Sequence, residues 1–214
     1  MRRIIIVFLL LFPRVLYAQE YTSLDRDFYF DISAIEIGSK EEPELEVLLD
    51  IKVANMFEEV CFVLDRADCD ALSLFFQDLR NEFNRMERLA KKNKVTNYEY
   101  PMSTEAPSLR ARWRTFLDDQ YGMSRRFTLN IVRGPYLKPV FSVGPTGGCS
   151  VDFRFELRDS GRSGASNEFQ FHLHDGELSV LARKLRYSRI ERVYWKKNPQ
   201  RPSKEELDEL FNRL

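Results

Sequence analysis

The sequence predicts an α+β fold, in which antiparallel sheets carry amphipathic helices packed on one face. Two kinds of pattern support this class. Residues 44–53 and 149–157 alternate apolar and polar side chains, as strands with one buried face do. Residues 71–86 and 175–185 repeat apolar side chains at intervals of three and four, as helices with one buried face do.

The longest predicted helix lies within residues 59–93 and follows a short strand. Residues 60–64 are apolar on both faces, which is typical of a central strand. The stripe of the helix is Leu72, Phe75, Phe76, Leu79, Phe83 and Met86. We expect Asp68 or Asp70 to cap it. With Asp65 these carboxylates also suggest calcium, but the turn lacks the glycine and closing glutamate of a calcium-binding loop.

The remaining strands are predicted from shorter patterns. They cover residues 28–37, 109–117, 127–131, 140–143 and 169–173. Residues 109–117 alternate arginine with apolar side chains, which favours a strand, although a helix stays open as an alternative. Residues 97–107 are predicted to be a polar connection. Asp175 is expected to cap a shorter helix whose stripe is Leu178, Leu181 and Leu185.

The predicted elements suggest two similar β-rich halves, each ending in a helix. The first half covers residues 19–100 and the second covers residues 101–198. Matching letters between the halves are few, so a true duplication stays an open question. Residues 199–214 are predicted to form a short C-terminal helix, because Ser203 and Glu206 have the spacing of a capping box.

The first 18 residues are predicted to be a signal peptide. A basic start, an apolar run from Ile4 to Phe12 and cleavage after Ala18 fit that pattern. The run is shorter than the roughly 20 residues of a membrane-spanning helix. We therefore expect an exported protein, periplasmic or secreted, that does not span a membrane.

Charge is distributed unevenly along the chain. Residues 19–100 hold 19 acidic and 10 basic side chains, whereas residues 101–214 hold 14 acidic and 20 basic ones. Such asymmetry can steer a partner, or it can neutralise itself within one fold. Self-neutralisation is the simpler interpretation.

Cysteine and histidine offer two enzymatic hypotheses. Three cysteines are too few for a disulfide scaffold, and pairing of Cys61 with Cys69 stays open. Cys149 could be a nucleophile with His172 or His174 as base. Alternation places Cys149 with the apolar side chains and both histidines on the opposite face, which argues against that site. The histidine pair could instead bind a metal ion, with Asp152 and Glu156 as further ligands.

A basic segment, residues 183–201, mixes cations with aromatic side chains. Such mixtures bind acidic glycans, anionic lipids or nucleic acid. Export disfavours nucleic acid as the partner. Candidate surface-binding residues are Arg110, Arg112, Trp113, Tyr194 and Trp195.

These observations favour a non-enzymatic binding or accessory module without a cofactor, whose partner is a protein or an acidic glycan. The alternatives are a hydrolase that uses Cys149 or a metal at His172 and His174, and a structural or assembly component.

Overall fold

The computed structural model describes residues 21–26, 30–38, 43–52, 58–118, 124–134, 137–157 and 167–199. Along stretches of the strands it describes the backbone alone. Within these ranges the strands are β1 (Thr22–Arg26), β2 (Phe30–Gly38), β3 (Pro43–Lys52), β4 (Glu58–Leu64), β5 (Tyr98–Pro101), β6 (Leu109–Asp118), β7 (Ser124–Gly134), β8 (Lys138–Val143), β9 (Cys149–Leu157) and β10 (Asn167–Leu173). The helices are α1 (Arg66–Lys92), α2 (Asp175–Lys184) and α3 (Tyr187–Lys197).

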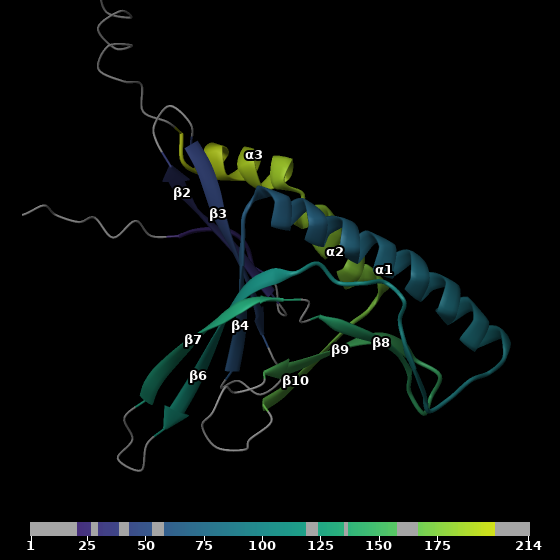
Figure 1. Ribbon diagram of the computed structural model, residues 1–214. Helices are drawn as coiled ribbons and strands as arrows, with labels where there is room; N and C mark the ends of the chain where they lie inside the picture. Colours follow the sequence, from purple (N-terminus) through teal and green to yellow (C-terminus); the bar gives the residue numbers. More distant parts are fainter. Residues whose placement is uncertain are drawn as a thin grey trace, which may run out of the picture.

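The strands form two antiparallel sheets (Figure 1). Sheet A has the order β1-β2-β3-β4-β6-β7, and sheet B has the order β10-β9-β8-β5. The α+β prediction is confirmed. So is the central position of β4, which lies between β3 and β6 with Cys61 to Leu64 all buried. Residues 109–117 form a strand, not a helix.

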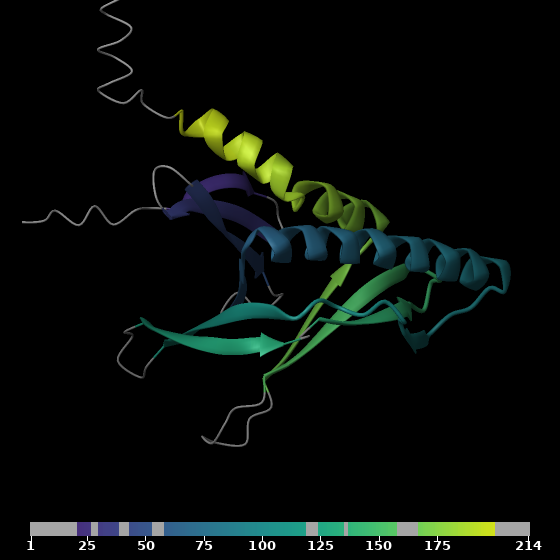
Figure 2. The ribbon, with the colours of Figure 1, turned by 45° about the horizontal axis from the view of Figure 1, so that its top comes forward.

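The three helices lie together on one side of the sheets (Figure 2). α1 extends over sheet B toward β5, whereas α3 lies beside β1 at the other end of the molecule. None of the described helices combines the length and the apolar character that crossing a bilayer requires.

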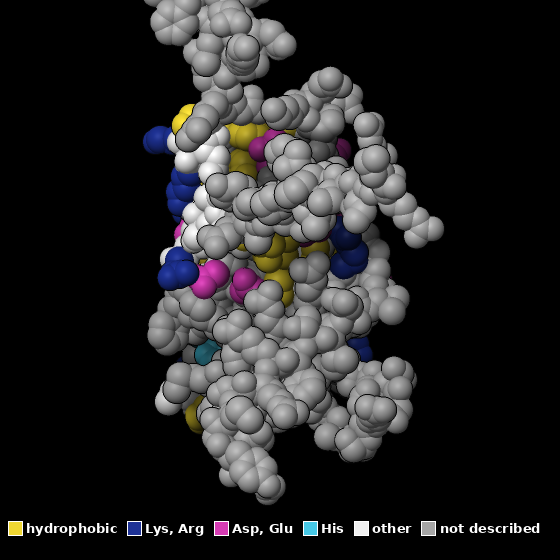
Figure 3. Space-filling model, turned by 90° about the vertical axis from the view of Figure 1, so that its left-hand side faces the viewer, with side chains coloured by type: hydrophobic (Ala, Val, Ile, Leu, Met, Phe, Trp, Pro, Cys, Tyr) yellow, Lys and Arg dark blue, Asp and Glu magenta, His cyan; other side chains and the backbone are white. Residues whose placement is uncertain are grey.

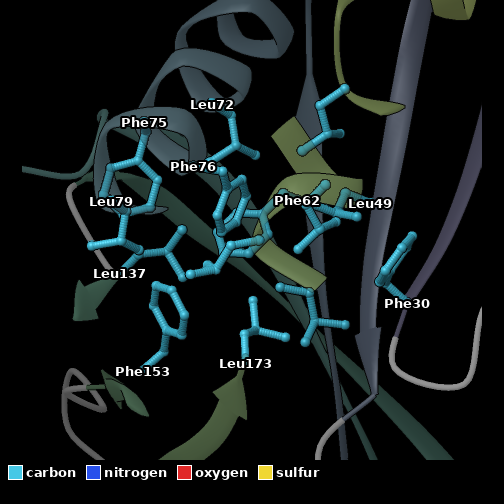
Figure 4. Packing of buried hydrophobic residues seen from close by; sticks show 14 of the residues in the cluster. Phe30, Leu49, Phe62, Leu72, Phe75, Phe76, Leu79, Leu137, Phe153 and Leu173 are labelled. Carbon is cyan, nitrogen blue, oxygen red and sulfur yellow. The ribbon is translucent and has the colours of Figure 1, made fainter. Parts of the chain in front are cut away.

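The main core lies between α1 and both sheets (Figure 4). From α1, Leu72, Phe76 and Leu79 are each 0% exposed. Phe76 packs edge-on against Phe153 of β9, with ring centroids 6.2 Å apart. Phe62 of β4 belongs to the same cluster, so one helix covers residues from both sheets.

The start of α1 differs from the prediction. The helix begins at Arg66, and its N-cap is Asp65, not Asp68 or Asp70. The Asp65 carboxylate accepts from the Asp68 amide, and the Asp68 carboxylate accepts from the Asp65 amide. The Asp70 carboxylate accepts from the backbone amide of Tyr187. These carboxylates therefore bind backbone amides at the starts of α1 and α3.

The start of α2 also differs. Its N-cap is His174, whose backbone amide donates to the Glu177 carboxylate. Asp175, the predicted cap, is the first helical residue. Its carboxylate accepts from Arg80 of α1 at 2.7 Å and from Asn84 at 2.9 Å. The Arg80 hydrogen bond lowers the pKa of Asp175, although burial alone would raise it. This contact ties α2 to α1.

The two predicted halves are not separate units of structure. β6 belongs to the second half but pairs with β4, so sheet A contains strands from both halves. Tyr98 and Tyr100, in the predicted polar connection, form part of β5, which pairs with β8 in sheet B. A boundary after Tyr100 cuts through β5. The predicted helix of residues 199–214 lies almost wholly outside the described residues, as does the predicted signal peptide.

α3 closes one end of sheet A with two buried tyrosines. The Tyr187 hydroxyl accepts from the Leu45 amide of β3, and the Tyr194 hydroxyl accepts from the Glu36 amide of β2, each at 3.1 Å. Both strands extend here beyond their neighbours: β1 pairs with β2 only as far as Ala34, and β4 pairs with β3 only as far as Val47. The tyrosines therefore satisfy amides that the sheet leaves without a strand partner.

Candidate functional site

The predicted surface-binding residues do not form one site. Arg110 is exposed on β6, between the buried Leu109 and Ala111, so it lies on the side of sheet A away from the helices. Tyr194 is buried on the helix side, so its prediction as a surface residue is wrong. Trp195 is half-buried beside it, with ring centroids 5.0 Å apart. Arg112 and Trp113 pair through their backbones with β4, and their side chains lie outside the described part.

The basic segment 183–201 contributes to folding through several of its cations. Lys184 contacts the Asp25 carboxylate at 2.8 Å, and Arg189 contacts it at 3.9 Å. The Lys197 ammonium donates to the Ser23 carbonyl at 2.7 Å. These contacts join α2 and α3 to β1, so basic residues of the second half bind acidic or carbonyl groups of the first.

Cys149 and the histidines lie as alternation predicts. Cys149 is 9% exposed and its thiol donates to the Gly147 carbonyl, whereas His172 and His174 are exposed. A histidine reaches the surface in the view of Figure 3. His174 Nδ1 lies 3.0 Å from the Cys149 backbone oxygen, not from the thiol. Burial, with the charge of Glu87 adding to it, raises the pKa of the Cys149 thiol. This arrangement does not provide an activated thiolate.

We expect native thiols to react slowly with iodoacetamide at neutral pH. Cys61, Cys69 and Cys149 are all buried and free, and the pKa values of Cys69 and Cys149 are raised above their ordinary value, mainly by burial. Mass spectrometry of the folded protein should show no rapid alkylation, whereas the protein unfolded in guanidinium should take up three equivalents, one for each cysteine. Fast labelling of Cys149 alone would restore the thiol-enzyme hypothesis.

Cys61 and Cys69 lie on opposite sides of sheet A. Cys61 packs with Leu48 and Val63 in a small cluster apart from the main core. Cys69 belongs to the main core under α1. Since Cys61 and Cys69 side chains are separated by the sheet, the suggested disulfide between them does not form in this fold.

The histidine pair lacks a third ligand in the part of the chain that the structure describes. The two rings are 6.0 Å apart. Asp152 is the cross-strand neighbour of His172, but its carboxylate accepts from Ser142 at 2.6 Å and from Ser150 at 3.0 Å. No group of three or more metal-binding side chains occurs among the described residues. The Glu156 side chain lies outside them.

An apolar groove lies between the end of α1 and β5. Its volume is about 210 Å³. Its walls are Met86, Leu89, Ala90, Asn93, Val95, Tyr98, Tyr100 and Phe141. Among the described residues, five large apolar side chains are exposed, and Leu89, Tyr98 and Tyr100 are three of them. Their gathering at one place distinguishes this groove from scattered surface apolar residues, which need no explanation.

Register explains why the two tyrosines face the groove. Tyr98 pairs with Val143 and Tyr100 with Phe141, and both partners are buried on the helix side of sheet B. β5 is the edge strand, so its tyrosines lie where helical cover ends. Their rings are 6.5 Å apart and nearly parallel, at 16°. They are 48% and 51% exposed, which leaves an aromatic wall open to a partner.

A sharp turn brings β5 back along α1. The Val95 amide donates to the Ala90 carbonyl, a bond that closes a helix in the Schellman manner. Lys94 takes the left-handed conformation that usually calls for glycine, with φ of 53°. Asn97 has a similar φ of 50°. The groove is therefore formed by residues close in sequence that a tight reversal places face to face.

A buried carboxylate holds the segment after β5. Glu82 of α1 is 9% exposed and accepts from the amides and hydroxyls of Ser103 and Thr104, at 2.6 to 2.9 Å. Burial alone would raise the pKa of Glu82, but the hydrogen bonds outweigh it and the pKa is lowered. The carboxylate fixes β5 against α1 without entering the groove.

The end of α1 that carries the groove is basic, and we call residues 85–94 its basic rim. Residues 85–94 contain Arg85, Arg88, Lys91, Lys92 and Lys94, all exposed, and one acid, Glu87. Glu87 is paired with Lys91 at 2.8 Å, and both act on Cys149 of β9, on the other side of β8 from β5. Lys92 and Lys94 have no acidic partner within the described ranges. These cations also complement the C-terminal end of the α1 dipole, so they stabilise the helix as well.

No known protein family, curated protein or solved structure matches this chain.

The groove was not predicted from the sequence. Tyr98 and Tyr100 show the two-residue spacing of a strand face, but the strand is too short for alternation to stand out in a polar stretch. The groove also needs Leu89, Ala90 and Asn93 at the end of α1, which lie beyond the predicted stripe ending at Met86. Only the turn at residues 93–97 reveals that Leu89 and the tyrosines share one surface.

Proposed function

We propose that this chain is an exported, non-enzymatic binding module that holds apolar side chains of a protein partner in the groove between α1 and β5. The observation that supports this proposal most is the gathering of Leu89, Tyr98 and Tyr100 at one groove. Export rests on the leader predicted in residues 1–18.

Size and chemistry favour a protein segment as the partner. Small-molecule pockets occupy roughly 300–1,000 Å³ and place several polar groups inside. This groove is smaller, and Asn93 is the only carboxamide among its walls. It suits one or two apolar side chains that anchor a longer segment, while the basic rim favours acidic residues beside them.

Addition of a strand to β5 is the less suitable mode of binding. β5 has only four residues, and its last, Pro101, has no amide hydrogen. An edge of this kind offers few backbone hydrogen bonds. The side chains of the groove therefore carry the recognition.

Selection from a library of displayed random peptides tests the proposal. We expect selected peptides to carry apolar residues flanked by aspartate or glutamate. Tyr98→Ser with Tyr100→Ser should weaken their binding about tenfold or more, since removal of an aromatic anchor costs upwards of roughly 1–2 kcal/mol. Both side chains are about half exposed, so the variant should keep its fold.

Leu74→Ser is the matched control, because Leu74 is 57% exposed on α1 but lies outside the groove. It should bind the peptides as the unchanged protein does. Peptides that bind equally well without the two tyrosines would contradict the proposal. So would binding to phosphatidylglycerol vesicles in place of peptides.

A further inference from the structure

We infer that the partner of the groove is residues 203–214 of a second copy of this chain, so that copies associate through this contact. The inference rests on the proposed function and names the occupant of the same groove. It is supported by the sequence of that segment, by the charge of the rim, and by the place where α3 ends.

The segment has the pattern of a groove-binding helix. Leu207, Leu210, Phe211 and Leu214 recur at intervals of three and four, which predicts one apolar stripe. Recognition of a helix by a groove uses anchors at this spacing. Ser203 and Glu206 have capping-box spacing at its start.

The charges of the segment and the rim are complementary. Residues 203–214 hold four acids, Glu205, Glu206, Asp208 and Glu209, against two bases. The rim at residues 85–94 holds five bases and one acid. Lys92 and Lys94, which lack an acidic partner within the described ranges, are available to the carboxylates of the segment. Opposite charges of this kind fix the register of a complex more than its affinity.

The segment cannot reach the groove of its own copy. α3 begins beside the first turn of α1, where the Tyr187 amide donates to Asp70, and ends near β1, where Asn198 contacts Thr22. The groove is lined by residues at the far end of α1, and Figure 2 shows α3 beyond the opposite end of that helix. The 27 residues of α1 span about 40 Å. The four residues 199–202 span at most about 14 Å. The occupant must therefore come from another molecule.

Segment and groove are different surfaces, so two copies can exchange segments in a closed dimer, and more copies can join head to tail in rings or open chains. The protein should consequently act as an assembly component, one of the alternatives open from the sequence.

Light scattering of the full chain over a range of concentrations, with two complementary variants, tests the inference. The segment variant carries Leu210→Glu and Phe211→Glu. The groove variant carries Leu89→Glu and Tyr98→Ser, at exposed positions. The unchanged protein should form dimers or larger assemblies as its concentration rises. Each variant alone should stay monomeric, because each has lost one of the two surfaces.

An equimolar mixture of the variants gives the decisive result. The intact segment of the groove variant should bind the intact groove of the segment variant, and the mixture should form dimers and stop there. Leu74→Glu, on α1 but outside the groove, should assemble as the unchanged protein does. Circular dichroism confirms that every variant is folded.

A mixture that stays monomeric, or an unchanged protein that stays monomeric at every concentration, would overturn the inference. If peptides from the display library still required Tyr98 and Tyr100 in that case, the proposed function would stand with a different partner. If the peptides did not require these two tyrosines, the further inference and the proposed function would both fail.

Discussion

Replacing Leu79 by aspartate is expected to unfold the protein. Leu79 is 0% exposed and lies in the main core beneath α1 (Figure 4). The change removes buried apolar volume and leaves a charge without a partner, which together cost upwards of about 5 kcal/mol. Since domains are stable by only about 5–15 kcal/mol, most of the folding free energy is lost. Far-UV circular dichroism during urea titration measures the effect.

Leu74→Asp provides the control on the same helix. Leu74 is 57% exposed, so the same chemical change should alter the free energy of unfolding by within about 0.5 kcal/mol. A Leu79→Asp protein that unfolds at the same urea concentration as Leu74→Asp would show that the α1 stripe does not form the core.

Glu82→Ala is expected to lower the free energy of unfolding by about 2–4 kcal/mol. The change leaves the amides and hydroxyls of Ser103 and Thr104 without their acceptor. Urea titration at neutral pH measures the loss. Glu87→Ala is the matched control on α1, because the Glu87–Lys91 pair reaches solvent, with Lys91 64% exposed, and contributes within about 1 kcal/mol.

The loss at Glu82 should depend on pH. The hydrogen bonds lower the pKa of Glu82 in the folded protein below its ordinary value of 4.5. Its contribution is therefore fully present above pH 4.5 and disappears as pH falls through the lowered pKa. The difference between the unchanged protein and Glu82→Ala should shrink in that acid range. A difference that stays constant down to acid pH would mean that Glu82 is not held as a carboxylate.

Local patterns predicted the buried faces of the elements well. The stripe of α1 and the alternation of β3 depend only on neighbours three, four or two residues away, and burial follows them at Leu72, Leu79 and Val47. The helix starts were less certain, because several acidic residues could each serve as the cap. Contacts from distant elements decide among them: Asp70 binds the start of α3, and Asp175 binds Arg80.

The arrangement of strands could not be predicted in the same way. β5 joins sheet B whereas β6, next in the chain, returns to sheet A. Pairing of this kind depends on packing between distant segments, which leaves no local period. For Tyr194, by contrast, a local pattern that predicts burial is present in the sequence. Its spacing from Tyr187 and Ile190 is that of a buried helix face, but the surrounding arginines and lysines made the segment look like a surface.

The capping of β2 and β3 by tyrosine hydroxyls bears on aggregation. A chain that stopped before α3 would leave the amides of Glu36 and Leu45 open at the end of an apolar sheet. Exposed strand amides beside apolar side chains are where amyloid-like stacking begins. Proteolytic loss of α3 would thus expose the ends of β2 and β3 and allow them to pair with strands of other copies of the chain.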